Sequence, residues 1–246
     1  MKLRPILVTL VVLALLGCAA CSSFPGVHRP ESAVVPPSGV LDFNALYGEN
    51  CAGCHGVDGK GGAAMALANP VFLAIADDSV IRRMATNGVP GTPMPAFAQS
   101  AGGMLTNKQI EALVGGIRAW ASPYALGDQA PPPYRAPVPG DPKRGADAYR
   151  TYCSSCHGAD GRGGSKGSSI VNGSYLALVS DQQLRTIVIA GRPELGAPDW
   201  RGDVDGRPMS PQDISDVVTW LAGQRPMLPG QPYPIASTNP SIGGPR

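Results

Sequence analysis

The chain has 246 residues, enough for two small domains, and 43% of its residues are apolar, as in an ordinary globular protein. Glycine (32 residues) and proline (26) are frequent whereas aromatic residues are few (6%), which predicts loop-rich domains joined by extended connectors. The 20 lysines and arginines nearly balance the 18 aspartates and glutamates, and no basic tract stands out, which argues against nucleic acid as a partner.

Residues 1–17 are predicted to be a lipoprotein signal peptide. Lys2 and Arg4 precede an apolar run at residues 5–17 that is shorter than the roughly 20 residues of a membrane-spanning helix. The run ends in LLGC, which resembles the bacterial lipobox, so Cys18 is the predicted lipidation site; an uncleaved anchor or an ordinary signal peptide is the alternative. We therefore expect a membrane-anchored protein on the periplasmic or extracytoplasmic side, with residues 18–40 as a flexible leader.

Two of the three C-x-x-C pairs in the chain are followed by histidine, giving CAGCH at residues 51–55 and CSSCH at residues 153–157. C-x-x-C-H is the attachment signature of c-type haem, in which both thiols bond the porphyrin and the histidine binds iron. A redox dithiol followed by histidine is the alternative for a single motif, and neither half supplies a second ligand pair for zinc. The motifs predict two covalently attached haems, with Cys51, Cys54, Cys153 and Cys156 as attachment residues and His55 and His157 as axial ligands. The pair CAAC at 18–21 belongs to the lipobox.

In the first half, a Gly-rich stretch leads to DDSVIRRMATNG (77–88), which predicts a short helix capped by Asp77 and ending at Gly88. A second helix is predicted from a capping box of Thr106 and Gln109, followed by an apolar stripe at 110, 113, 114 and 117. Between the two, Met94 lies 39 residues after His55 in the sequence TPMPAF. Its rigid proline flanks make Met94 the predicted sixth ligand of the first iron, with Met84 and Met104 as competitors.

The linker that follows, residues 122–141, is rich in proline and is predicted to be a semi-rigid extended spacer. The second half then repeats the first at an offset of 102 residues, which places Tyr149, Cys153 and His157 opposite Tyr47, Cys51 and His55. Residues 181–191 match the short helix, with Ser180 and Gln183 as a possible capping box. Ser210 and Pro211 begin the last predicted helix, whose stripe lies at 214, 217, 218 and 221.

This order of motifs and helices resembles the class I cytochrome c family, here as two fused copies forming a dihaem c-type cytochrome. The resemblance rests on the two CxxCH motifs and Met94, and it implies an all-α fold of two tandem domains. The predicted segments are domain 1 (41–122), a Pro-rich linker (123–140), domain 2 (141–225) and a Pro-rich tail (226–246). The resemblance also implies His/Met ligation and one-electron transfer. Pro70 resembles the family's proline whose carbonyl accepts a hydrogen bond from the axial histidine, and Asn172 stands at that offset in the second half.

The second half departs from this pattern at the sixth ligand. Residues 191–200 align with 87–97 and place Ala197, which cannot bind iron, opposite Met94. Met209, which follows Pro208, is the predicted sixth ligand of the second iron, at the end of an extended loop. In the alternative hypothesis, Met209 packs in the core and the iron is open to small molecules. Met227 is a remote third candidate. Arg192, Arg201 and Trp200 lie in the same loop and are candidate partners of the haem propionates, or ordinary surface residues.

These observations predict a protein that carries single electrons between membrane-associated respiratory or photosynthetic partners: a membrane oxidoreductase, an oxidase or a small soluble carrier. The alternative is a dihaem oxidoreductase of the peroxidase or thiosulfate-oxidising type, in which the first haem supplies an open second haem. Ala197 motivates that alternative, and Glu194 is the only nearby acid–base candidate. A ligand-binding sensor is a third possibility, although the chain carries no output domain.

Overall fold

The structure is a computed structural model that describes residues 35–122, 126, 129–202, 204 and 206–226. The chain divides into two compact units, Met1–Gly39 and Val40–Arg246. In the first unit the described part holds the 3-10 turn η2 (Pro37–Gly39). The predicted signal peptide, Cys18, Met227 and the rest of the tail after Pro226 lie outside the described residues. All other elements described below belong to the second unit.

Every regular element among the described residues is a helix, which confirms the predicted all-α class. None of these helices has the length and apolar character needed to cross a membrane. In the first half the helices are α2 (Phe43–Asn50), α3 (Ala52–His55), α4 (Pro70–Ile75), α5 (Asp78–Asn87), η3 (Gln99–Ala101) and α6 (Asn107–Arg118). In the second half they are α7 (Pro142–Tyr152), α8 (Ser154–His157), α9 (Gly173–Ala177), α10 (Asp181–Ala190), η4 (Pro193–Leu195) and α11 (Pro211–Ala222).

Side-chain caps fix where the helices of both halves begin. Thr106 and Gln109 form the predicted capping box of α6, and Ser210 caps α11 with Pro211 in the first turn. The reciprocal partner of Ser210 is Asp213. Ser180 accepts a hydrogen bond from the Gln183 amide as expected, although the return bond of a full capping box is not formed.

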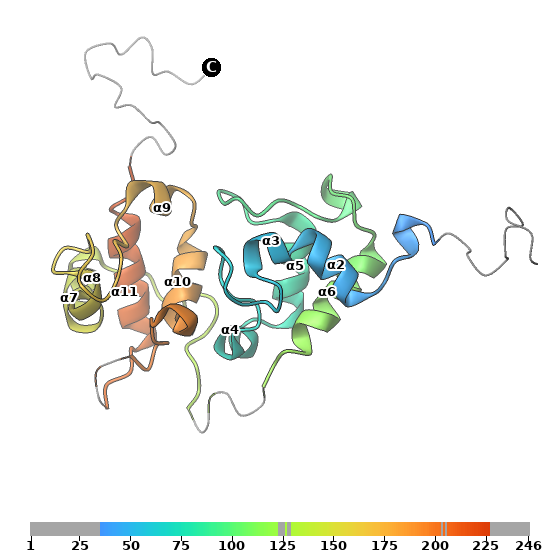
Figure 1. Cartoon of the computed structure of the whole chain (residues 1–246). Helices are drawn as coiled ribbons and strands as arrows, with labels where there is room; N and C mark the ends of the chain where they lie inside the picture. Colours follow the sequence, from blue (N-terminus) through green and yellow to red (C-terminus); the bar gives the residue numbers. More distant parts are fainter. Residues whose placement is uncertain (1–34, 123–125, 127–128, 203, 205, 227–246) are drawn as a thin grey trace, which may run out of the picture. The chain divides into compact units, whose positions relative to one another are not determined.

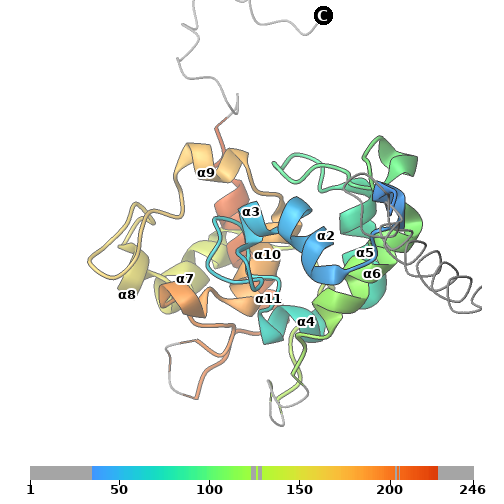
Figure 2. The ribbon, with the colours of Figure 1, turned by 45° about the vertical axis from the view of Figure 1, so that its right-hand side comes forward.

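The last helix of each half supplies the centre of the core. The predicted stripes are buried: Ile110, Leu113, Val114 and Ile117 on α6, and Ile214, Val217, Val218 and Leu221 on α11. Figures 1 and 2 show α7 beside α11, and α2 and α6 are likewise in contact. Tyr47 meets Trp120 edge to face with ring centroids 5.0 Å apart, and Tyr149 stacks on Trp220 at 4.4 Å.

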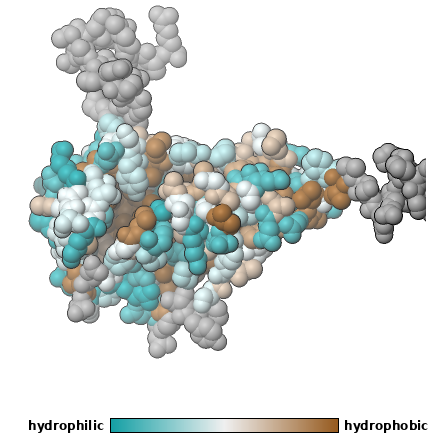
Figure 3. All heavy atoms as spheres, viewed as in Figure 1, coloured by the Kyte–Doolittle hydropathy of each residue, from teal (hydrophilic) through white to brown (hydrophobic). Residues whose placement is uncertain are grey.

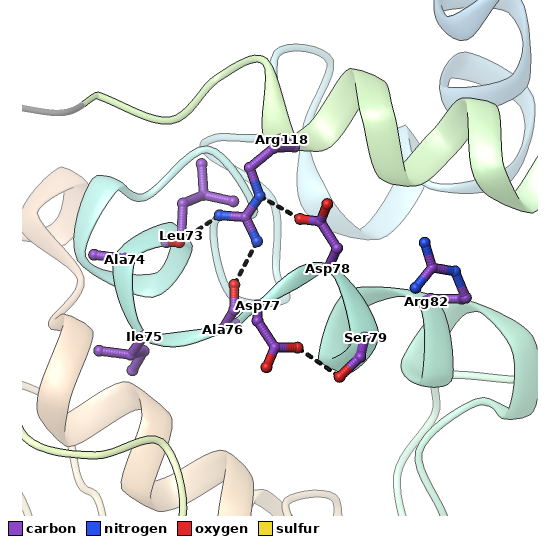
Figure 4. Close-up of a pocket in the computed structure, with 9 residues that line it drawn as sticks. All are labelled: Leu73, Ala74, Ile75, Ala76, Asp77, Asp78, Ser79, Arg82 and Arg118. Atoms are coloured by element: carbon purple, nitrogen blue, oxygen red, sulfur yellow. Dashed lines mark hydrogen bonds and ion pairs between the residues drawn. The ribbon is translucent and has the colours of Figure 1, made fainter.

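An arginine clamp, which sequence reasoning did not predict, recurs in both halves. Figure 4 shows Arg118 reaching across a surface pocket to Asp78 at 2.7 Å, with its other nitrogens donating to the carbonyl oxygens of Leu73 and Ala76. In the second half, Arg225 bonds in the same way to Asp181 and to the carbonyl oxygens of Leu176 and Val179. This pocket therefore contains a structural contact, and no residue of a CxxCH motif lines it.

Part of the linker is held by the second half. Arg185 on α10 is 2% exposed, and its guanidinium donates to the carbonyl oxygens of Pro133 and Tyr134. Gln182 donates to the same Tyr134 oxygen at 2.8 Å. The residues around 133 and 134 are thus held against α10 by hydrogen bonds. A direct bond also joins the halves, because the buried Asn69 amide donates to the carbonyl oxygen of Ala190 at 2.9 Å.

Candidate haem sites

Each CxxCH motif forms one helical turn directly after a longer helix. Cys51 ends α2 by donating to the carbonyl oxygen of Tyr47, and its own carbonyl accepts from the amides of Cys54 and His55 at 3.2 and 3.0 Å. In the second half, Cys153 repeats these bonds with Cys156 and His157 at 3.2 and 2.9 Å. One turn therefore places two thiols and an imidazole of each half on adjacent positions of the same short helix.

The first cysteine of each motif has a partly buried thiol that stays protonated. None of the four cysteines in the two motifs forms a disulfide with another described residue. Burial, and secondarily the neighbouring Cys54 or Cys156, raises the pKa of the Cys51 and Cys153 thiols to about 11. A redox dithiol needs a lowered thiol pKa, since the thiolate is the form that attacks a disulfide. Cys51 and Cys153 therefore lack the thiolate character of an attacking redox cysteine.

Both histidine rings are held in the tautomer that suits an iron ligand. Nδ1 of His55 lies 2.7 Å from the carbonyl oxygen of Met65, and Nδ1 of His157 lies 2.7 Å from that of Ser168. A carbonyl only accepts, so Nδ1 carries the proton and Nε2 keeps its lone pair for a metal. Burial lowers the pKa of His55 and Arg192 lowers it further, against the opposing effect of the Met65 bond, which favours the neutral imidazole that a metal requires.

The expectation for Pro70 is wrong. Pro70 is the first residue of α4, where its carbonyl belongs to the helix, and the Met65 carbonyl takes the histidine proton instead. Asn172 likewise does not stand in the place of Pro70. The Asn172 side chain caps α9 by accepting hydrogen bonds from the backbone amides two and three residues further on, and Asn69 caps α4 in the same way. Asn172 is therefore the counterpart of Asn69, and the offset between the halves at this point is 103 residues.

Glycines let the loop after each motif fold back onto it. A Cβ on Gly62 would lie 2.1 Å from the carbonyl oxygen of Cys54, and Gly56 has a φ of +84° that other residues rarely adopt. In the second half, a Cβ on Gly167 would lie 2.9 Å from Cε1 and Nδ1 of His157. The Gly-rich composition is therefore needed to bring backbone against the axial histidine. Taken together, the thiols, the tautomers and this close approach fit a c-type haem in each half.

The loop carrying Met94 is tied to the end of α5. Gly88 ends that helix with a φ of +68°, and a Cβ there would lie 2.6 Å from the Met94 carbonyl oxygen. The same oxygen accepts from the Val89 amide at 3.1 Å. Of the competing methionines, Met84 packs against the core and its sulfur accepts from the Tyr134 hydroxyl, whereas Met104 is 83% exposed. Met94 remains the candidate ligand of the first iron.

The corresponding loop of the second half is built in the same way around Ala197. Gly191 ends α10 with a φ of +67°, and the Ala197 carbonyl accepts from the Arg192 amide at 3.0 Å. The structure thus places Ala197 where the first half has Met94. Met209 lies further along, is 7% exposed and belongs to the hydrophobic core, with its amide donating to the carbonyl oxygen of Trp200 at 2.8 Å.

The charged residues of this loop already have protein partners. Arg192 pairs with Glu194 at 2.5 Å and also donates to the carbonyl oxygen of Gly62 in the first half. Arg201 pairs with Asp199 and lies over the buried Trp200 ring at 4.9 Å. Trp200 is therefore a core residue, and the structure gives it no polar contact through its side chain among the described residues.

Sequence reasoning missed the two residues whose carbonyls hold the histidines, Met65 and Ser168. Any residue supplies a carbonyl, so their side chains carry no signal. The glycines around them were visible in the sequence, and Gly167 in particular indicates where backbone approaches the His157 ring.

Comparison with known proteins gives matches over both halves. The family described as cytochrome C oxidase, cbb3-type, subunit III, matches residues 40–115 and 140–221. The cbb3-type cytochrome c oxidase subunit CcoP of Azospirillum sp. (strain B510) is 30% identical over 130 residues, covering 48% of this chain and 39% of that protein. The cytochrome bc1 complex cytochrome c subunit of Mycobacterium tuberculosis (strain ATCC 25618 / H37Rv) is 26% identical over 193 residues, covering 74% of this chain and 64% of that protein.

The chain thus spans less than two thirds of the length of these relatives. Among solved structures, a chain of the Kuenenia stuttgartiensis reducing HAO-like protein complex Kustc0457/Kustc0458 aligns with a TM-score of 0.45 and 18% identity, over 81% of this chain and 100% of that one.

Proposed function

We propose that this chain, which belongs to the family described as cytochrome C oxidase, cbb3-type, subunit III, carries single electrons through two covalently bound c-type haems. Membership of a cytochrome c family implies covalent c-type haem, and the two matched segments each contain one CxxCH motif, which supports a count of two. When bound, the haem iron supplies the one-electron redox change. The attachment residues are Cys51, Cys54, Cys153 and Cys156, with His55 and His157 as axial ligands.

The observation that carries this proposal is the pairing of each motif histidine with a backbone carbonyl at 2.7 Å. The pairing fixes the ring orientation and presents Nε2 as the ligand atom in both halves. In the first half, Met94 is the proposed sixth ligand, so that iron has no position for substrate. A closed iron with a thioether ligand suits electron transfer rather than bond-making chemistry.

The proposed partners are redox proteins: a membrane oxidoreductase, an oxidase or a small soluble electron carrier. The relatives named above are subunits of a cbb3-type oxidase and of a cytochrome bc1 complex, which supports this class of partner. On the face shown in Figure 3, apolar residues occur in small groups among hydrophilic ones, as suits small and transient encounters. We further propose an extracytoplasmic location, with Cys18 as the lipid-bearing residue that anchors the chain to a membrane.

Haem counting tests the proposal directly. The pyridine haemochrome of the purified full-length protein should give two haems per chain. The double variant Cys51→Ser/Cys54→Ser and the matched variant Cys153→Ser/Cys156→Ser should each retain one. In stopped-flow spectra, a quinol-oxidising membrane fraction should reduce the haems of the purified protein, and a terminal oxidase should reoxidise them. A chain that binds one haem or none, or that exchanges no electrons with either membrane preparation, would contradict the proposal. Labelling with palmitate, lost in Cys18→Ala, tests the anchor.

A second candidate function is a dihaem oxidoreductase of the peroxidase or thiosulfate-oxidising type, which is favoured by Ala197 at the place of Met94. Against it, Glu194 is already bound by Arg192 at 2.5 Å, so the loop offers no ready acid–base group there. Turnover of peroxide or thiosulfate above the solution background, with an electron donor or acceptor present, would favour this second function over the carrier.

A further inference from the structure

The two halves can be superimposed through the residues that begin their last helices. Leu105 precedes the cap Thr106, and Met209 precedes the cap Ser210. The Leu105 amide donates to the carbonyl oxygen of Phe97 at 2.8 Å, and the Met209 amide donates to that of Trp200 at the same distance. Leu105 is 6% exposed and Met209 is 7% exposed. Met209 is thus the counterpart of Leu105.

In the first half this position and the ligand position are different. Leu105 fills the core, whereas Met94 lies in the loop held to the end of α5. The second half keeps both positions, with Met209 in the core and Ala197 held in the loop by the Arg192 amide. The segment from Ala197 to the cap Ser210 is one residue longer than that from Met94 to Thr106, so the second loop is not an extended one.

The two described carboxylates nearest to Ala197 in the loop are already paired with arginines. Glu194 is paired with Arg192 at 2.5 Å, and Asp199 is paired with Arg201 at 2.5 Å. Both carboxylates are therefore engaged by guanidinium groups. The methyl side chain of Ala197, which stands at the place of Met94, has no atom that could bind iron and would supply no ligand to the proposed haem.

We infer that the second haem lacks a protein sixth ligand and has an open axial position beside Ala197, which takes an uncharged diatomic molecule of the carbon monoxide or nitric oxide class. This rests on the proposed function, because it requires a haem on His157. Met209 acts as a packing residue, equivalent to Leu105. The inference makes the two irons chemically unequal, one closed by Met94 and one able to bind a small ligand.

Carbon monoxide titration of the reduced full-length protein, followed in the Soret band and scaled to the haemochrome count, is the test. Half of the haem should bind carbon monoxide in the unmodified protein. Met209→Leu, a substitution that conserves volume, should leave that fraction at one half. Ala197→Met should reduce it to none, and Met94→Ala should raise it to all of the haem.

A reconstruction in the first half provides the matched control. In Met94→Ala/Leu105→Met, the first half acquires the arrangement of the second, and all of the haem should still bind carbon monoxide. If instead Leu105→Met closes that iron again, a methionine at this position reaches the haem, and the inference is overturned. The inference is also overturned if the unmodified protein binds no carbon monoxide, because both irons then have a protein ligand. If Met209→Leu then allows half of the haem to bind carbon monoxide, Met209 is that ligand of the second iron; otherwise another residue is. Fewer than two haems per chain contradicts the proposed function itself.

Discussion

Asp216 on α11 provides the most direct test of how the second half is held together. Asp216 is 2% exposed, and its carboxylate accepts four hydrogen bonds. Two come from Nε and Nη2 of Arg144 at 2.7 and 3.0 Å. One comes from the backbone amide of Asp141 at 2.7 Å, and one from the side-chain amide of Gln212 at 2.8 Å. The carboxylate therefore joins α11 to the start of α7.

Asp216→Asn keeps the shape of the side chain but replaces one acceptor oxygen by an NH2 group. That NH2 group then faces N–H donors of the surrounding residues, to which it cannot bond. The loss of a buried charged partner costs about 3–5 kcal/mol, and each lost bond to a charged group about 1.5–3 kcal/mol. Arg144 is 58% exposed and regains water when the pair is broken, which reduces the cost. We expect the free energy of unfolding of the second half to fall by about 3 kcal/mol.

Urea unfolding followed by far-ultraviolet circular dichroism measures this loss. Asp147→Asn is the matched control, because Asp147 is 68% exposed in its pair with Arg150 and its replacement should leave the midpoint unchanged. Burial by itself raises the pKa of Asp216, but the bonds from Arg144, Asp141 and Gln212 outweigh it and hold the pKa below its usual range. Because the pKa of Asp216 is lower in the folded than in the unfolded protein, its carboxylate contributes fully to the free energy of unfolding above about pH 4. That contribution is lost as the pH falls below this value.

The difference between the unmodified protein and Asp216→Asn should therefore shrink as the pH falls below about 4. A difference that stays constant down to pH 3 would mean that the charge is not its source. A loss equal to that of the exposed control would refute the reasoning from burial.

Three further outcomes are expected. Arg118→Ala removes the hydrogen bonds to the end of α4 and should lower the free energy of unfolding of the first half by about 2 kcal/mol, which calorimetry would measure. Arg118→Lys should restore only part of this stability, because an ammonium group lacks the planar, forked set of donors of a guanidinium. Gly167→Ala should displace the His157 ring and shift the reduction potential of one haem in a spectroelectrochemical titration, whereas Gly115→Ala, where a Cβ meets nothing within 4 Å, should shift neither. Arg185→Gln should speed limited proteolysis of residues 131–140, and an unchanged rate would mean that the bonds to the linker do not hold it.

The sequence predicted those parts of the fold that depend on local side-chain chemistry. Thr106, Gln109, Ser210 and Pro211 carry explicit start signals, and the apolar stripes behind them have the helical period, so both last helices lie where expected. The CxxCH turns follow from spacing alone. Ala197 opposite Met94 also follows, because Gly88 and Gly191 mark the same helix end in both halves.

Contacts to backbone atoms could not be predicted in this way. The Met65 and Ser168 carbonyls, the carbonyls held by Arg118, and the Pro133 carbonyl under Arg185 carry no residue-specific signal. A fixed offset of 102 also concealed a one-residue insertion between His157 and Asn172, which is why Asn172 was placed opposite Pro70 instead of Asn69.

The arginine in the middle of α10 decides where the second half can be separated from the first. Its counterpart Arg82 forms an exposed pair with Glu111 at 2.6 Å, but the residue facing Arg185 is Ser215, and linker carbonyls take the place of the carboxylate. A fragment that starts at residue 141 would leave a buried guanidinium without those acceptors, which is costly. The smallest second half that folds alone should therefore begin near residue 131, inside the segment that composition assigns to the linker.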